Sequence, residues 1–424
     1  MWRTSITLFK TRLGQFRSSS LMMNSIYLML ATNTIAVFGF AFWIVVTRDH
    51  TSAAVGLTAT LLSLSGLLSM LSLAGFDTTF VRFLPKSEHR NAEINSGMII
   101  VAIVGAVLSL GFVLSFPFTS PSLAFVLHNP WYLAAFVFFT VVTSLNTLTN
   151  SILLAYRCAR DIFIINLLFS TLKVALPLLI ADGSVMTLFV LVGISQLAGL
   201  ILSLVILRAQ LRYVFSPRLH LDFLRVIKKY SFSVYVSSIL NLLPPTLLPL
   251  IVVRQLGPES AAYYYMAFTI AGVLYTISYA SMQSAFAEGS HNESAMKAHV
   301  AKAAKLIGAL LVPAILFTVL LSNVILKIFG SEYAAAGSTL LQLFALSAVV
   351  VAVYSALGTI FKVTKDLRSL VIMNAVYALV ILSFSYLFVS SMGIIAIGWA
   401  WVFGNIAAAS TGLFFLKRSK HLLT

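Results

Sequence analysis

The charge best placed to bind a ligand is Lys173, which lies within a long apolar stretch and has Pro177 one turn later. A cation at the centre of a membrane helix costs about 2.5 to 3.5 kcal/mol on insertion scales, so we expect this side chain to face a water-filled cavity or a partner rather than lipid. The alternative is a misjudged span whose lysine stem reaches an interface. In a cavity, the ammonium group would attract phosphate or carboxylate groups.

Two arginines and a proline pair could act around such a ligand. Arg48 and Arg254 stand at corresponding ends of the two halves of the chain, where they could close on an anion or serve as ordinary interfacial anchors. Pro244 and Pro245 remove backbone donors and predict a bend or unwinding of their helix. We interpret the bend as a gate, and a static packing kink is the alternative.

Amide side chains in the apolar stretches could hydrogen-bond sugars in the same cavity. Those we include in the candidate substrate site are Asn33, Asn150, Asn241 and Asn374. Amides in membrane helices also join neighbouring helices, at about 1 kcal/mol each, so helix packing is the alternative role.

The chemistry of an enzyme is missing from this pattern. None of the 12 acidic residues lies deep in an apolar stretch, so the cavity should be net positive, and the 7 histidines show no spacing that suits metal ligands. The longest predicted external loop, 119–130, has no carboxylate and only His128 as a titratable group. The sequence therefore predicts no metal, no cofactor and no catalytic residues.

The elements that position these side chains must be membrane helices. Hydrophobic residues make up 60% of the 424 residues and charged residues only 9%, against about 25% charged in a soluble domain. A helix needs about 20 apolar residues to cross a bilayer, and the chain supplies about twelve such stretches. We predict an all-α polytopic protein with spans near 25–47, 54–75, 96–118, 131–155, 162–182, 184–207, 230–253, 261–287, 305–327, 336–361, 369–390 and 393–416.

The basic residues predict the orientation of these spans. The formal charge is +16, and most of the 28 basic residues fall at the two termini and in the even-numbered connections. The positive-inside rule then places both termini in the cytoplasm of a multi-pass protein of the inner (plasma) membrane. This distribution accounts for most of the excess charge without a nucleic-acid partner.

The N-terminal segment 1–24 is predicted to be cytoplasmic and amphipathic. Trp2, Ile6, Phe9, Leu13 and Phe16 recur every three or four positions beside basic residues, which is typical of an interfacial helix. A cleavable signal peptide is the competing interpretation, but the short apolar core and small-residue cleavage site are missing.

The chain also divides into two similar halves. Three charges after the fourth span match three charges after the tenth at an offset of 205 residues: Arg157, Arg160 and Asp161 against Lys362, Lys365 and Asp366. Arg48 and Arg254 differ by 206, and Asn166 and Asn374 by 208. We predict six-helix lobes at 25–208 and 230–416, a cytoplasmic linker at 209–229 and a cytoplasmic tail at 417–424. Such repeats suggest alternating access to a site between the lobes.

Short motifs carry a family resemblance. They are the Arg48 turn, Gly75-Phe76 followed by Val81-Arg82-Phe83-Leu84-Pro85, and Arg254-Gln255-Leu256-Gly257-Pro258-Glu259. With the order of spans, they resemble the polysaccharide (O-antigen-type) repeat-unit flippases of the multidrug, oligosaccharidyl-lipid and polysaccharide exporter superfamily. The resemblance covers essentially the whole chain.

The resemblance implies a V-shaped pair of six-helix lobes that moves a polyprenyl-diphosphate-linked oligosaccharide from the cytoplasmic to the external leaflet for surface polysaccharide biosynthesis. It also implies membrane lipids, a glycan polymerase and glycosyltransferases as partners. Lipid II flippases of the superfamily typically carry fourteen spans and arginines in the first helix, whereas no charge lies between Ser25 and Thr47. A cation-coupled drug antiporter and a polytopic glycan enzyme are the alternatives.

Overall fold

The protein is a bundle of long helices. A computed structural model describes residues 20–180, 183–216, 222–291 and 296–418, and within these ranges all regular structure is helical. Segment 1–19 and the C-terminal residues 419–424 lie outside the described residues, and so does the interfacial helix predicted near the N-terminus.

Twelve of the described helices are long and apolar enough to cross a membrane. The first six are α2 (Ser20–Asp49), α3 (Ser52–Leu73), α5 (Arg90–Leu114), α8 (Pro130–Ala155), α9 (Ala159–Leu179) and α10 (Val185–Leu211). The second six are α11 (Asp222–Leu256), α12 (Pro258–His291), α13 (Met296–Lys327), α14 (Ser331–Val363), α15 (Leu367–Met392) and α16 (Ile395–Arg418). The predicted all-α fold with twelve spans is confirmed.

Several connections between the long helices, expected to be loops, contain short helices. After α3, Ala74 and Gly75 both adopt positive φ values of 48° and 84°, which end one helix and start α4 (Phe76–Phe83) in a new direction. The 3₁₀ turn η1 (Leu84–Lys86) follows it. The longest predicted external loop folds as α6 (Phe116–Thr119), η2 (Pro121–Leu123) and α7 (Phe125–His128).

The outer surface of the bundle is apolar, as contact with lipid requires. Leu320, Leu379 and Phe414, on three different helices, are 78%, 68% and 60% exposed. In water such side chains would be an aggregation hazard, whereas in a bilayer they face hydrocarbon. This explains why the spans are apolar on nearly every side.

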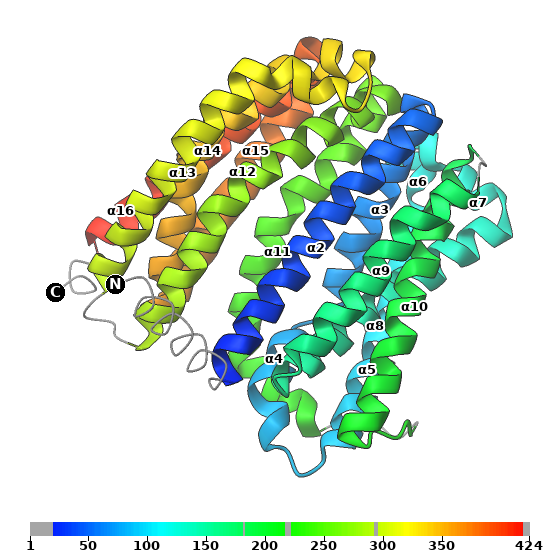
Figure 1. Ribbon diagram of the computed structural model, residues 1–424, viewed down its shortest axis with the longest axis vertical. Helices are drawn as coiled ribbons and strands as arrows, with labels where there is room; N and C mark the ends of the chain where they lie inside the picture. The colour runs from blue at the N-terminus through cyan, green and yellow to red at the C-terminus, as the bar shows by residue number, and fades with distance from the viewer. Residues whose placement is uncertain (1–19, 181–182, 217–221, 292–295, 419–424) are drawn as a thin grey trace, which may run out of the picture.

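The helices form two groups that correspond to the two halves of the chain (Figure 1). In the first group α2 packs against α9 and α10 packs against α8, and in the second α12 packs against α14 and α15 against α16. Helix α3 lies between the groups, because it contacts both α11 and α12. The boundaries of the lobes and of the 209–229 linker stay predictions.

The two groups touch most tightly where α2 ends and α3 begins. A Cβ atom built on Gly56 would lie 1.8 Å from the carbonyl oxygen of Pro258, the first residue of α12. The rings of Trp43 and Tyr265 meet across the same interface, with centroids 5.0 Å apart. We call Gly56, Pro258, Trp43 and Tyr265 the Gly56 contact. Only a glycine at position 56 allows the two helices to approach this closely.

The repeat is real, but its register differs from the one expected from charges. Val363 lies 208 residues after Ala155, and Leu367 lies 208 residues after Ala159, so the helix ends on both sides of this turn share an offset of 208. Arg157 and Lys365, also 208 apart, both adopt left-handed φ values, of 61° and 59°. The 205-residue match of charges is therefore wrong by three residues, whereas the 208-residue pairing of Asn166 with Asn374 agrees with the helix ends.

Candidate functional site

Lys173 lies on α9, six residues before the helix ends at Leu179. Because α9 packs against α2, the ammonium Nζ sits 4.6 Å from the ring centroid of the fully buried Phe42. It also lies 6.0 Å from the ring of Phe169, one turn earlier on α9. A cation over aromatic faces is stabilised by the ring quadrupole, which holds Lys173 inside the bundle and away from lipid.

The Lys173 side chain opens onto a cavity of about 230 Å³. Six helices line it. Five belong to the first half of the chain, and the sixth, α12, belongs to the second half and contributes Tyr265. The lining residues are Trp43, Leu62, Ser63, Ser65, Gly66, Phe139, Thr143, Phe169, Lys173, Phe189, Val192, Gly193, Gln196 and Tyr265. At roughly 30 Å³ for each liquid water molecule, this volume corresponds to about eight waters.

The cavity carries one positive charge and a set of neutral polar groups. Among the described residues that line it, none is a carboxylate, and the polar ones are hydroxyls and the Gln196 amide. Gln196 Oε1 accepts a hydrogen bond of 2.5 Å from Asn146 Nδ2, which holds the Gln196 side chain in place. Asn146 Oδ1 is buried and has no partner among the described residues. The arrangement suits an anion of a few atoms.

Arg48 and Arg254 do not line this cavity. Each is exposed and lies in the last turn of its helix, α2 and α11. Cations in that position interact favourably with the negative end of the helix dipole, which is reason enough for both arginines. Their predicted role in closing on a ligand stays a prediction.

The four amides of the predicted site do not come together in the Lys173 cavity. Asn33 is exposed on α2, and Asn150 is half-buried on α8 with an Oδ1 that has no partner among the described residues. Neither lines the Lys173 cavity. Their contact with sugars stays a prediction.

Asn241 and Asn374 instead belong to a hydrogen-bond network within the second half. The Tyr354 hydroxyl donates to Asn374 Oδ1 at 2.6 Å and accepts from Asn241 Nδ2 at 2.7 Å. Asn374 Nδ2 donates to the Ser237 Oγ at 2.7 Å. The network ties α11, α14 and α15 together, which is the helix-packing role considered for these amides.

Helix α11 continues through Pro244 and Pro245 without unwinding. The Thr246 hydroxyl donates to the carbonyl oxygen of Leu242 at 2.7 Å, next to the proline pair. This bond does not replace those lost at the prolines, whose missing N–H groups would have reached the carbonyls of Leu240 and Asn241. The gating role of the proline pair stays a prediction.

Asp77 is the carboxylate that a cation-coupled mechanism would need in the cavity. It lies on the short helix α4, away from the residues lining the Lys173 cavity. Burial raises the pKa of its carboxyl above the usual value. Within the described residues, no group of three His, Cys, Asp or Glu side chains could hold a metal ion.

Sequence reasoning found Lys173 but missed most of its surroundings. Phe169 could have been paired with it, since residues four apart share a helix face. Phe42 and Tyr265 could not, because nothing in the sequence says that α2 packs on α9 or that α12 reaches the first half.

Comparison with known proteins agrees with this architecture. The family model described as "Polysaccharide biosynthesis protein" matches residues 45–338. Curated protein sequences gave no match. The expected resemblance to a polysaccharide flippase family is therefore supported at the level of the family.

Solved structures share the fold at low identity. A multidrug resistance MATE family transporter of the MOP superfamily in an inward-facing conformation has 16% identity and a TM-score of 0.70, covering 93% of this chain and 98% of its own. Its outward-facing counterpart has 16% identity, a TM-score of 0.61 and coverages of 95% and 96%. The lipid II flippase MurJ, inward closed, has 13% identity, a TM-score of 0.74 and coverages of 92% and 87%.

By their descriptions these neighbours are transporters and a flippase, and the chain shares their fold. Twelve apolar helices make the chain a multi-pass membrane protein. With a family model that matches well over half of its length, the chain belongs to the polysaccharide biosynthesis protein family.

Proposed function

We propose that this protein is a flippase that moves a polyprenyl-diphosphate-linked oligosaccharide from the cytoplasmic to the external leaflet by alternating access. It would work in the inner (plasma) membrane with both termini in the cytoplasm, upstream of glycan polymerisation and downstream of glycosyltransferases. Support comes from the polysaccharide biosynthesis family, from the fold shared with a lipid II flippase and from the one-sided distribution of basic residues.

The observation that carries the proposal is the charge of Lys173 in a cavity that has no carboxylate among its described lining residues. A cation 4 Å from a phosphate charge gains about 4 kcal/mol at an effective dielectric constant of 20, against about 1 kcal/mol in water. The same field repels cationic drugs, and none of the described lining residues is a carboxylate that would offset it. The antiporter alternative would need Asp77, which lies elsewhere.

The size of the cavity limits what can bind in this conformation. A volume of about 230 Å³ accommodates one phosphate group but not a string of sugars. The oligosaccharide would therefore enter only when the two helix groups separate, while the polyprenyl chain stays in lipid. Lys173 is then a contact for the phosphate end of the substrate, and the sugars lie between the lobes.

The experiment is complementation of cells that lack the protein. Lys173→Met removes the charge and keeps an unbranched apolar stem, Lys173→Arg keeps the charge, and Lys327→Met removes an exposed lysine from the end of α13. We expect Lys173→Met to reduce surface polysaccharide about tenfold or more, since 1.4 kcal/mol is one factor of ten. The lipid-linked oligosaccharide should then accumulate, inaccessible to an impermeant reagent added outside.

The controls separate loss of charge from loss of protein. Lys173→Arg should retain most export, Lys327→Met should retain all of it, and each variant should reach the membrane at the parent level. Full export by Lys173→Met would contradict the role of this lysine. Unchanged glycolipid with altered drug tolerance in cells lacking the protein would contradict the proposed function itself and favour the antiporter.

A further inference from the structure

A second and larger cavity lies on the outer side of the first half of the chain, against α5, α8 and α10. Its volume is about 630 Å³, and no residue lines both it and the Lys173 cavity. The side chains that line it are Met98, Ile99, Ala102, Ile103, Leu145, Leu200, Leu204, Arg208, Tyr213, Val214 and Phe215. Nearly all of them are apolar, so this pocket is suited to hydrocarbon rather than to a sugar.

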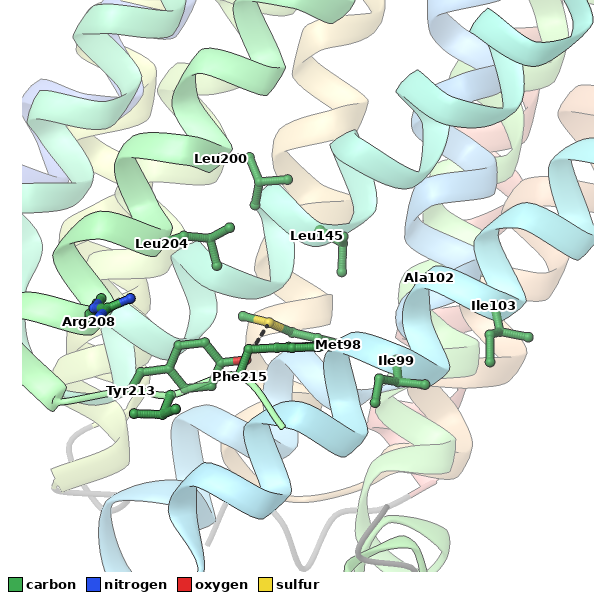
Figure 2. Close-up of a pocket in the computed structure, with 11 residues that line it drawn as sticks. Met98, Ile99, Ala102, Ile103, Leu145, Leu200, Leu204, Arg208, Tyr213 and Phe215 are labelled. Carbon is green, nitrogen blue, oxygen red and sulfur yellow. Dashed lines mark hydrogen bonds between the residues drawn. The ribbon is translucent and has the colours of Figure 1, made fainter. Parts of the chain in front are cut away.

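The pocket opens toward the surroundings of the bundle. Two of its lining residues, Ile103 and Phe215, are 58% and 62% exposed. Figure 2 shows Arg208 beside Tyr213 at one end of the row of apolar side chains, with Ile103 at the opposite end. In a membrane protein, an apolar hollow that opens outward meets lipid chains.

One wall of the pocket is held by specific hydrogen bonds. After α10, Arg212 adopts a left-handed φ of 52°, and the Tyr213 N–H donates to the carbonyl of Leu207 at 3.3 Å, which turns the chain back. The buried Tyr213 hydroxyl donates to Asn95 Oδ1 at 2.6 Å, and Asn95 Nδ2 donates to the Val214 carbonyl at 3.3 Å. The segment after α10 is thus fastened to α5, and the pocket is preformed.

The hydrogen bond from Tyr213 persists over the physiological pH range. Burial raises the pKa of this hydroxyl to about 12, so the group stays protonated and continues to donate. The wall built by residues 212–215 should therefore not depend on pH near neutrality.

Charge and size identify the occupant. The Arg208 side chain is exposed in the last turn of α10, and no carboxylate is among the described residues that line the pocket. A guanidinium group binds phosphate through paired, charge-assisted hydrogen bonds. A volume of about 630 Å³ equals that of about 20 liquid water molecules at roughly 30 Å³ each, which suits one fatty acyl chain and not a long polyprenyl chain.

We propose that this pocket binds one acyl chain of an anionic phospholipid, with the lipid phosphate on Arg208. The chain lies along α5 between Ile99 and Ile103, and the headgroup stays at the membrane interface beside Val214 and Phe215. The site is separate from the cavity that holds Lys173. The inference does not depend on which substrate the protein transports.

Binding is tested on the purified full-length protein in nanodiscs containing phosphatidylglycerol and phosphatidylcholine, with bound lipid counted by native mass spectrometry. Ala102→Phe places a ring inside the pocket, and Val107→Phe places the same ring on the exposed face of α5. Arg208→Gln removes the charge at the pocket, and Arg368→Gln removes an exposed arginine from the start of α15.

We expect the parent protein, Val107→Phe and Arg368→Gln to retain phosphatidylglycerol equally. Ala102→Phe should lose both lipids, and Arg208→Gln should lose the preference for phosphatidylglycerol by about tenfold or more, the effect of removing a charged hydrogen bond. Equal retention by Ala102→Phe and Val107→Phe, or equal effects of the two arginine substitutions, would overturn the proposal.

A second measurement uses the unmodified protein, so it does not depend on the folding of any variant. Phosphatidylglycerol with a photoreactive group in its acyl chain should label the pocket residues Ile99, Ala102 and Leu204. Labelling spread evenly over exposed residues such as Leu320 and Leu379 would mean that the lipid has no fixed site. Export of surface polysaccharide measured in parallel distinguishes the two proposals. Absence of transport together with normal labelling would contradict the proposed function and leave the lipid site in place.

Discussion

Replacing Gly56 with alanine should push apart the two halves of the protein at the Gly56 contact. The added Cβ atom would lie 1.8 Å from the carbonyl oxygen of Pro258, 2.8 Å from its carbonyl carbon and 3.0 Å from the nitrogen of Ala262. All three are backbone atoms, so no side-chain rotation relieves the overlap. Real Cβ atoms essentially never come closer than 3.0 Å, and α3 and α12 must therefore separate by at least 1.2 Å, the difference from 1.8 Å.

Two effects of this substitution oppose each other, and only one of them acts on the conformational equilibrium. Alanine favours a helix over glycine by about 1 kcal/mol, but α3 is helical whether the halves are together or apart, so this gain cancels. The overlap is present only when the halves are together, and overpacking of this kind costs about 1 to 3 kcal/mol. The packed conformation should therefore lose population by roughly 5- to 150-fold relative to the separated one.

Spin-label distances measure this shift directly. The single cysteine is first replaced by Cys158→Ser, and labels are then attached at Asp49, at the end of α2, and Glu259, at the start of α12, both of which are exposed. These positions lie in different halves of the chain and beside the Gly56 contact. We expect the Gly56→Ala protein to show a longer distance between the labels, or a second, longer population.

Gly272→Ala is the matched control, because this glycine also lies within a long helix, α12, but has nothing within 4 Å of its added Cβ. It should leave the distance distribution unchanged and keep or slightly raise thermal stability. If Gly56→Ala gave the same distribution as the parent and the control, the packed Gly56 contact would not exist in the membrane. The structural basis for alternating access proposed here would then be wrong.

Two further predictions concern stability. Tyr354→Phe removes the hydroxyl that donates to Asn374 and accepts from Asn241, so it should lower the free energy of unfolding by about 1 to 3 kcal/mol in thermal or denaturant unfolding. The control is Tyr377→Phe, which changes no hydrogen bond among the described residues and should have little effect. Burial raises the folded-state pKa of Asp77, so its contribution to stability is present at acid pH and is lost as the pH rises. Asp77→Asn should therefore raise the melting temperature at pH 7, and by less near pH 4. An equal gain at both pH values would contradict a buried carboxyl.

The twelve spans were predictable because length and hydropathy alone decide whether a helix can cross a bilayer. The short helices between them were not. Helix α4 has only 8 residues, too few for a periodic pattern to stand out, and its start depends on the backbone angles of Ala74 and Gly75. Gly75 indicates such a break, but Ala74 in the same left-handed region does not follow from its residue type.

The register of the repeat shows which kind of sequence signal is reliable. Charges in an exposed turn can move by three residues without changing any packing, which is why the 205-residue match of Arg157 with Lys362 was misleading. The left-handed turn fixes Arg157 against Lys365, and the helix ends on either side agree with it. Buried or conformationally restricted positions therefore align the two halves better than charges do.

The candidate site was predictable only in its charge. The cost of a cation inside a membrane helix singled out Lys173, and the structure places this lysine in a cavity beside Phe42 and Phe169. The residues that surround it come from five other helices, and their assembly depends on tertiary packing that short-range patterns do not encode. The amides Asn241 and Asn374 satisfied the same polarity criterion but are occupied by Tyr354.

A row of aromatic contacts links the charge of Lys173 to the interface between the two halves. The ammonium lies over Phe42, the Phe42 ring meets Trp43 at 4.9 Å, and Trp43 meets Tyr265 of α12 at 5.0 Å. Tyr265 is the only residue of the second half among those lining the Lys173 cavity in the described chain, so the cavity is closed on that side by the opposite half. Separating α3 from α12 at Gly56 would withdraw Tyr265 and expose Lys173 at the Arg48 end of the bundle. The same movement that opens the lobes would thus uncover the Lys173 charge proposed to hold the substrate phosphate, which couples access to binding without any additional moving part.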